Sequence, residues 1–180
     1  KKMLSKMDVI VTSTETLAKD MRNISDKPVY VIPDRHELNF YKRQKVHQPV
    51  EKPVLVWFGY AANFVRLSHL LPYINENNYE LLTICEEPVS GGKFIKWELE
   101  SVNNNILQGD IVLNPPDLYG YKSNNKSVSA WALGLPVAET VEDIKRFTSY
   151  EERIKEADKR YQEVKESYSI SRSAEDLINI

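Results

Sequence analysis

The chain has 180 residues, of which 42% are hydrophobic and 28% are charged, and its formal net charge is -2. This length suits one domain with a single core, and the small net charge gives no long-range attraction to nucleic acid. No apolar run is long enough to span a bilayer. Because Cys85 is the only cysteine, an intramolecular disulfide and a cysteine-based zinc cluster are excluded, and a reducing, cytoplasmic setting is predicted.

The start of the sequence predicts a strand, a helix and a second strand. The first strand is expected over residues 8–12, and Thr12 and Glu15 then fit a capping box that opens the helix. The second strand is expected over residues 29–32. The buried face of the helix is predicted to consist of Leu17, Met21 and Ile24. Residues 1–6 are typical of the end of a helix that runs directly into a strand, so we expect the sequence to be a piece of a longer protein.

Residues 34–52 are predicted to form a linker, because they are polar, lack a sustained period and contain Pro49. The run that begins at Asp34 (Asp-Arg-His-Glu) invites a catalytic interpretation, but such residues occur in loops for many reasons, and a solvated hinge is favoured. The linker divides the chain into residues 1–48, the end of one domain with its connection, and residues 49–180, a second domain.

The second domain is predicted to begin with a buried strand over residues 53–59, because the run is continuously apolar. Gly59 opens a turn of small residues that ends at Asn63, and such a turn lets the backbone approach a ligand closely. A tight turn without a ligand is the alternative. The turn lacks the full Gly-x-Gly-x-x-Gly fingerprint, so a dinucleotide-dependent dehydrogenase is not expected. The next helix is predicted to kink or begin at Pro72 and to leave His69 at the surface.

Three further strands are expected over residues 79–85, 94–97 and 110–113. Glu86 and Glu87 follow the first of these, and we interpret them as solvated, because adjacent side chains on an extended chain point apart. Trp97 either stacks on an aromatic ligand or belongs to the core. Asn114 leaves the carboxyl end of the last strand, where open α/β sheets bind ligands.

Residues 121–137 are the central motif: a polar loop, a helix and the start of a strand. Ser123 or Asn124 can cap the helix, because a short side-chain oxygen accepts an orphan backbone N–H there. A glycine and a proline then end it. Lys122 and Lys126 lie beside the helix N-terminus, whose N–H groups and dipole favour a phosphate. This combination predicts an anion site.

The rest of the chain predicts three helices. Thr140 can cap a short helix and Ser149 a long one, and a last helix is expected over residues 174–178. The long helix has an apolar stripe made of Ile154, Ala157, Tyr161, Val164 and Tyr168. The alternation of strands and helices predicts an α/β fold with a doubly wound, Rossmann-like parallel sheet.

The motif Lys-Ser-x-Asn-Lys from Lys122, followed by Ala-Trp-Ala-x-Gly-x-Pro-Val from Ala130, resembles the donor-binding helix of GT-B glycosyltransferases, the retaining group 1 enzymes among them. The resemblance covers nearly the whole chain, but only the C-terminal half of such a two-domain enzyme. Many retaining members carry two glutamates eight positions apart in this segment. Tyr121 and Ser129 stand at the matching positions, so the resemblance implies a divergent subgroup.

The resemblance also implies roles for individual residues. Lys126 and Lys122 would neutralise the charge of the departing diphosphate, assisted by the N–H groups at Asn124 and Asn125. Ser129 would lie near the ribose. The remaining residues expected at the donor site are Gly59, Tyr60, Asn63, Trp97, Glu98, Asn114 and Ser123.

The function implied is transfer of a sugar from a nucleotide sugar to an acceptor hydroxyl, as in polysaccharide biosynthesis. No metal is implied, and no Asp-x-Asp motif is present. A glycan or lipid-linked acceptor would bind a missing N-terminal domain, so this chain alone is expected to be inactive. The full-length protein would be cytoplasmic or lie at the inner membrane face. The alternatives are a non-catalytic nucleotide- or phosphate-binding regulatory module and a GT-B-like nucleotide-sugar epimerase.

Overall fold

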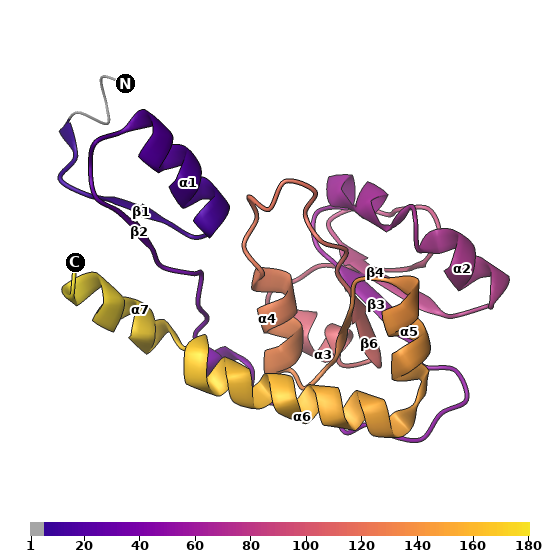
Figure 1. Cartoon of the computed structure of the whole chain (residues 1–180). Helices are drawn as coiled ribbons and strands as arrows, with labels where there is room; N and C mark the ends of the chain where they lie inside the picture. Colours follow the sequence, from indigo (N-terminus) through magenta and orange to yellow (C-terminus); the bar gives the residue numbers. More distant parts are fainter. Residues whose placement is uncertain (1–5) are drawn as a thin grey trace.

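Two parallel sheets form the scaffold of the computed structural model, which describes residues 6–180 (Figure 1). The smaller sheet pairs β1 (Ile10–Thr12) with β2 (Val29–Val31), and α1 (Glu15–Ile24) connects them. The predicted strand, helix and strand are therefore confirmed. Of the helix end expected over residues 1–6, residues 1–5 lie outside the described part of the chain.

Two details of α1 differ from the prediction. The helix is capped by Thr14, whose side chain accepts from the Leu17 N–H at 3.2 Å, while Thr12 stays in β1. The chain needs two further residues to turn from the strand into the helix. Of the residues of α1 only Ala18 is buried, and Ile24 is 52% exposed. A sheet of two strands is too narrow to cover a whole helical face.

The larger sheet has five parallel strands in the order β5-β4-β3-β6-β7. The bounds of its strands are β3 (Leu55–Phe58), β4 (Leu81–Cys85), β5 (Lys93–Lys96), β6 (Ile111–Leu113) and β7 (Val137–Ala138). Since β3 lies in the middle and later strands are added first on one side and then on the other, the sheet is doubly wound and Rossmann-like, as predicted.

Helices cover both faces of this sheet (Figure 1). Leu55 and Trp57 pack on one face and Val56 on the other, because side chains alternate along a strand. The first face carries the 3₁₀ helix η3 (Ala61–Leu67), α2 (Leu71–Glu76) and α5 (Val141–Thr148). The second face carries α3 (Val102–Ile106) and α4 (Asn125–Ala132). The long helix α6 (Tyr150–Ser167) packs across α4 and α5.

The local signals in this domain are largely confirmed. Pro72 lies at the start of α2, and His69 is exposed. Thr140 forms a capping box with Asp143 on α5, and Ser149 caps α6. The last helix, α7 (Ile170–Ile178), begins earlier than predicted, where the N–H of Ile170 donates to the carbonyl of a linker residue, His36, at 3.0 Å.

The run that begins at Asp34 is not a solvated hinge, and that interpretation was wrong. The backbone N–H of His36 donates to the Tyr168 carbonyl at 2.9 Å. Arg35 donates to the Ser167 carbonyl at 2.9 Å and pairs with Asp176 at 2.6 Å. The junction of α6 and α7 leaves carbonyls free, and the linker satisfies them, so the connection between the two sheets is docked onto the C-terminal helices. The linker also contains a short 3₁₀ helix, η2 (Leu38–Phe40).

Candidate functional site

A cavity of about 520 Å³ opens at the carboxyl edge of the larger sheet. It lies where β3 and β6 are neighbours, the point at which the strand order reverses. Gly59 follows β3, Asn114 follows β6 and Glu139 follows β7, so the three loops converge there. Ligands of doubly wound sheets bind at this point.

Most of the residues predicted for the site line this one cavity. They are Gly59, Tyr60, Asn63, Asn114, Lys122, Ser123, Asn124, Asn125 and Lys126. The cavity is also lined by residues that sequence reasoning did not single out for the site, namely Arg66, Pro115, Pro116, Asp117, Ser127 and Glu139. The sequence offered a signal for Arg66 that was not used. Arg66 lies three positions after Asn63 on the helix that follows the glycine turn, so the two side chains share a face.

Three cations face the cavity from three different segments. Lys126 comes from the first turn of α4, Lys122 from the loop before it, and Arg66 from η3. The Lys122 Nζ donates to the Asn63 side-chain oxygen at 3.0 Å. Arg66 donates to the Pro115 carbonyl at 3.1 Å. Lys122 is thus held by a neutral oxygen, which leaves its charge available to an anion. Arg66 also lies 3.6 Å from the carboxylate of Asp117, which offsets part of its charge.

Lys126 lies in the most apolar part of this cluster. Its Nζ is 4.8 Å from the centre of the Trp57 ring and 5.8 Å from that of Phe58. Burial lowers the pKa of Lys126 from its ordinary 10.5 to about 7, and the charges of Arg66 and Lys122 act in the same direction. The negative charge of an anion in the cavity would act in the opposite direction on this pKa, so it would favour the ammonium form.

Gly59 ends β3 with a φ of +145°, a conformation that residues with a side chain rarely adopt. A Cβ added there would lie 3.4 Å from the Lys126 Nζ, which is about an ordinary contact distance. It is therefore the backbone conformation that requires glycine at this turn.

The N-terminus of α4 is organised differently from the prediction. Asn124 is the N-cap residue, but no side chain caps the helix. The Ser123 hydroxyl donates instead to Asp34 Oδ2 at 2.5 Å, and the Asn125 amide donates to the same oxygen at 3.0 Å. The Asn124 amide donates to the Tyr168 hydroxyl at 2.9 Å. The polar side chains that were expected to cap α4 thus hold the linker and α6, and among residues 6–180 no side chain accepts from the first backbone N–H groups of α4.

Comparison with known proteins places the fold. No family profile and no curated protein matches the sequence. Solved structures do match, among them a chain of the "Glycosylation Associate Protein (Gap123) complex from Streptococcus agalactiae". The TM-score is 0.50 and the identity 12%, and the match covers 98% of this chain but 45% of that one. At this identity the likeness shows the fold alone. The Rossmann-like architecture is therefore shared with a protein whose description concerns glycosylation.

Three residues expected at the donor site lie outside the main cavity. The Ser129 hydroxyl is 3.1 Å from the Tyr41 hydroxyl, on the side of α4 that faces the linker. Trp97 is 44% exposed, so a core position is wrong for it. It lines an adjoining cavity of about 240 Å³ that also borders Gly59. Glu98 is exposed and lines neither cavity.

Two acidic side chains near these cavities have defined positions. Glu86 lines the smaller cavity, and its carboxylate accepts from the Ala61 N–H at 3.0 Å, at the start of η3. Glu86 and Glu87 are both exposed, as predicted, and Glu86 in addition satisfies an orphan donor at a helix end. Asp20 on α1 accepts from the hydroxyl of Tyr121 at 2.8 Å, which ties the loop before α4 to the smaller sheet.

Within residues 6–180, no group of three or more His, Cys, Asp or Glu side chains is arranged to hold a metal ion. Over the same residues, no helix combines the length and the apolar character needed to cross a membrane.

Proposed function

We propose that this chain binds the diphosphate of a nucleotide sugar and serves as the donor-binding part of a glycosyltransferase. One observation carries the proposal: Lys122, Lys126 and Arg66 converge with the uncapped N-terminus of α4 in a cavity at the switch point of a doubly wound sheet. Backbone N–H groups and cations together are suited to an anion with several charged oxygens. The description of the structural neighbour as glycosylation-associated supports a role in glycosylation.

The chemistry asked of such a site is stabilisation of the leaving group. In sugar transfer, the acceptor oxygen bonds to the anomeric carbon and gives up its proton. The bond from that carbon to the diphosphate breaks, and its electron pair stays on the phosphate oxygen. Negative charge therefore builds up on the diphosphate, where positioned cations lower the barrier. Lys126 and Lys122 are the residues proposed for this role.

A second candidate is a non-catalytic module that binds a nucleotide or phosphate. The specific observation in its favour is that Asp34 already occupies the hydrogen-bond donors of Ser123 and Asn125 at the start of α4. Neither Tyr121 nor Ser129 supplies a carboxylate. Turnover of the nucleotide sugar by the full-length protein separates the two candidates, because the second predicts binding without turnover.

The test of binding is a thermal-shift panel with UDP, GDP, ADP and TDP, their sugar derivatives and inorganic phosphate. A ligand that binds only the folded state raises the melting temperature. Selective stabilisation by one nucleoside diphosphate supports a donor site. Stabilisation by inorganic phosphate alone, or by no compound at all, contradicts it.

A matched pair of variants locates the binding. Lys126→Met is expected to weaken binding of the selected nucleoside diphosphate by about 1.5–3 kcal/mol, because a charge-assisted bond is lost. Lys155→Met removes the same charge from the exposed side of α6 and should leave the affinity within about 0.5 kcal/mol of wild type. Equal affinities of the two variants would remove Lys126 from the site.

A further inference from the structure

Glu139 is one of two carboxylates in the cavity, and the other, Asp117, is paired with Arg66 at 3.6 Å. Glu139 follows β7 directly, and β7 pairs with β6 so that the N–H of Asn114 donates to the Ala138 carbonyl at 3.0 Å. Glu139 and Asn114 therefore stand next to each other at the carboxyl edge of the sheet, and both line the main cavity. The carboxylate reaches this cavity from a different element than either Lys122 or Lys126.

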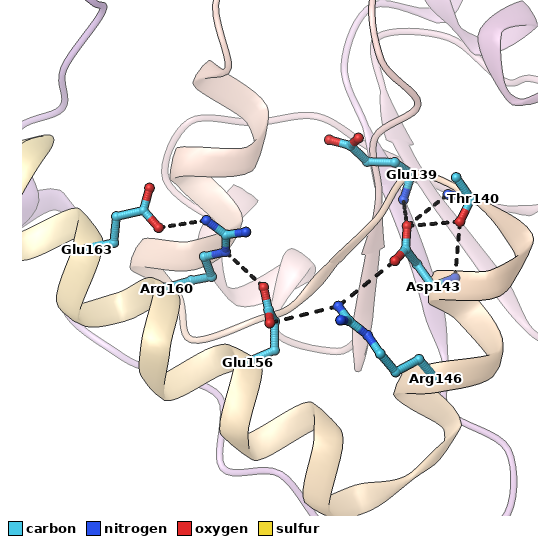
Figure 2. A network of polar contacts seen from close by, with 7 residues as sticks. All are labelled: Glu139, Thr140, Asp143, Arg146, Glu156, Arg160 and Glu163. Carbon is cyan, nitrogen blue, oxygen red and sulfur yellow. Dashed lines mark hydrogen bonds and ion pairs between the residues drawn. The ribbon is translucent and has the colours of Figure 1, made fainter.

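The backbone that carries Glu139 is held firmly, while its side chain is left for other use. Asp143 accepts from the N–H of Glu139 at 3.1 Å and from the N–H and hydroxyl of Thr140 at 3.2 and 3.0 Å. Figure 2 shows the Glu139 carboxylate turned away from Asp143, toward the side on which α4 lies. Within residues 6–180, this carboxylate forms no ion pair within 4.0 Å.

A chain of charges connects this turn to α6 (Figure 2). Arg146 lies 3.9 Å from Asp143 and 3.8 Å from Glu156, which in turn binds Arg160 at 2.8 Å. The network fixes the turn after β7, and its charged groups pair with one another. Glu139 takes part in none of these ion pairs. Burial, followed by the neighbouring Asp143, raises the pKa of Glu139, whereas Arg160 acts in the opposite direction.

A carboxylate has only acceptor oxygens when ionised, so it repels phosphate and binds hydroxyl groups. A ligand that carries both phosphate and sugar hydroxyls offers a partner to both kinds of side chain, because its phosphates can bind the cations and its hydroxyls can bind Glu139. We propose that Glu139 determines specificity by accepting a hydrogen bond from a sugar hydroxyl of the bound nucleotide or nucleotide sugar. It would thereby supply the acidic contact that Tyr121 and Ser129 do not provide. This inference rests on the proposed function of the same cavity.

The test compares three probes that share phosphates and differ in hydroxyl groups: inorganic pyrophosphate, UDP and UDP-glucose, with the base exchanged for whichever one the thermal-shift panel selects. Glu139→Gln is expected to weaken the binding of at least one hydroxyl-bearing probe by roughly 10-fold to 100-fold relative to pyrophosphate, measured by calorimetry. If the variant loses affinity for both UDP and UDP-glucose, Glu139 binds the ribose hydroxyls. If it loses affinity for UDP-glucose alone, Glu139 binds the hydroxyls of the transferred sugar. Glu139→Asp should restore part of the affinity.

Glu142→Gln is the matched control, because it removes the same charge from an exposed position on the neighbouring helix α5. It should leave the ratio of the affinities unchanged. If Glu139→Gln changes the affinity for all three probes equally, Glu139 acts only through its charge and the inference is overturned. If wild-type protein binds none of the probes, the proposed function itself fails, and that outcome is distinct.

Discussion

Two cations in this protein, Arg153 and Lys126, have opposite surroundings. Arg153, on the first turn of α6, is 0% exposed and donates to three backbone carbonyls, those of Phe147, Thr148 and Gln48, at 2.8–3.0 Å. Lys126 is half-buried, and its Nζ lies over two aromatic rings with two further cations near it. Over residues 6–180, it forms no ion pair within 4.0 Å.

The difference indicates what each cation is for. Arg153 fixes the end of α5 and the linker at Gln48, because its three hydrogen bonds, one buried and two partly buried, satisfy the carbonyls there. Lys126 satisfies nothing of that kind, and its surroundings disfavour its charge. A basic group in a cleft whose pKa is strongly lowered is a candidate functional group. The free-energy cost of holding its charge there is recovered when an anion binds.

The largest expected effect is on stability at Arg153. Arg153→Met leaves one buried and two partly buried hydrogen bonds to carbonyls without their donor, so the free energy of unfolding is expected to fall by roughly 2–5 kcal/mol, measured by urea denaturation. Arg146→Met serves as control, because Arg146 is half-exposed and its ion pairs are 3.9 and 3.8 Å long, and a loss below about 1 kcal/mol is expected. Similar losses in the two variants would show that Arg153 is not structural.

Substitution of Lys126 is expected to raise the free energy of unfolding rather than lower it. The folded protein holds this group at a pKa of about 7, against an ordinary 10.5, so between these pH values it binds fewer protons than the unfolded chain. The cost of burying the charge is fully present below pH 7 and disappears as the pH rises to about 10.5. Lys126→Met should therefore stabilise the protein by roughly 2–4 kcal/mol at pH 6, and the gain should shrink above pH 7. Melting temperatures of both proteins across this range check it, and a gain independent of pH would contradict it.

The smallest effect, and the most specific, is proton uptake on binding. At about pH 8 the Lys126 amine is mostly neutral, and a bound diphosphate should restore its proton. Binding of UDP, or of the diphosphate that the panel selects, is expected to take up roughly half a proton or more at pH 8. Calorimetry in two buffers with different ionisation enthalpies measures this uptake. Lys126→Arg keeps the charge without titrating, so it should bind with little uptake. Equal uptake by both proteins would assign the proton to another group.

Several local features could be predicted because they depend on neighbours in the sequence. Gly134 adopts a φ of +72° and ends α4, with the N–H of Leu135 donating to Ala130 at 2.9 Å. The Thr140 and Ser149 caps form where short polar side chains precede apolar periods. The strands of the larger sheet form where apolar runs end in glycine or in polar loops. Each of these signals is complete within a few residues.

Predictions failed where a side chain had a choice of partners. Ser123 or Asn124 was expected to cap α4, but Ser123 donates to Asp34, which lies 89 positions earlier in the chain, and Asn124 donates to Tyr168. Sequence reasoning could not weigh a local N–H against a distant carboxylate, because the latter comes close only when the linker docks. The burial of Arg153 was not predicted for the same reason, since nothing in the local sequence distinguishes one arginine on a charged helix as buried.

By itself, the sequence determined most of the elements, the caps of α5 and α6 and the parallel, doubly wound sheet, because period and turn chemistry are local properties. It also placed Lys122 and Lys126 beside a helix N-terminus. Only the tertiary structure decided that Arg66 and Glu139 share their cavity and that Ser129 does not. The physical reason is that the strand order brings the ends of β3, β6 and β7 together, and that the direction of a side chain depends on the faces of the helices that pack around it.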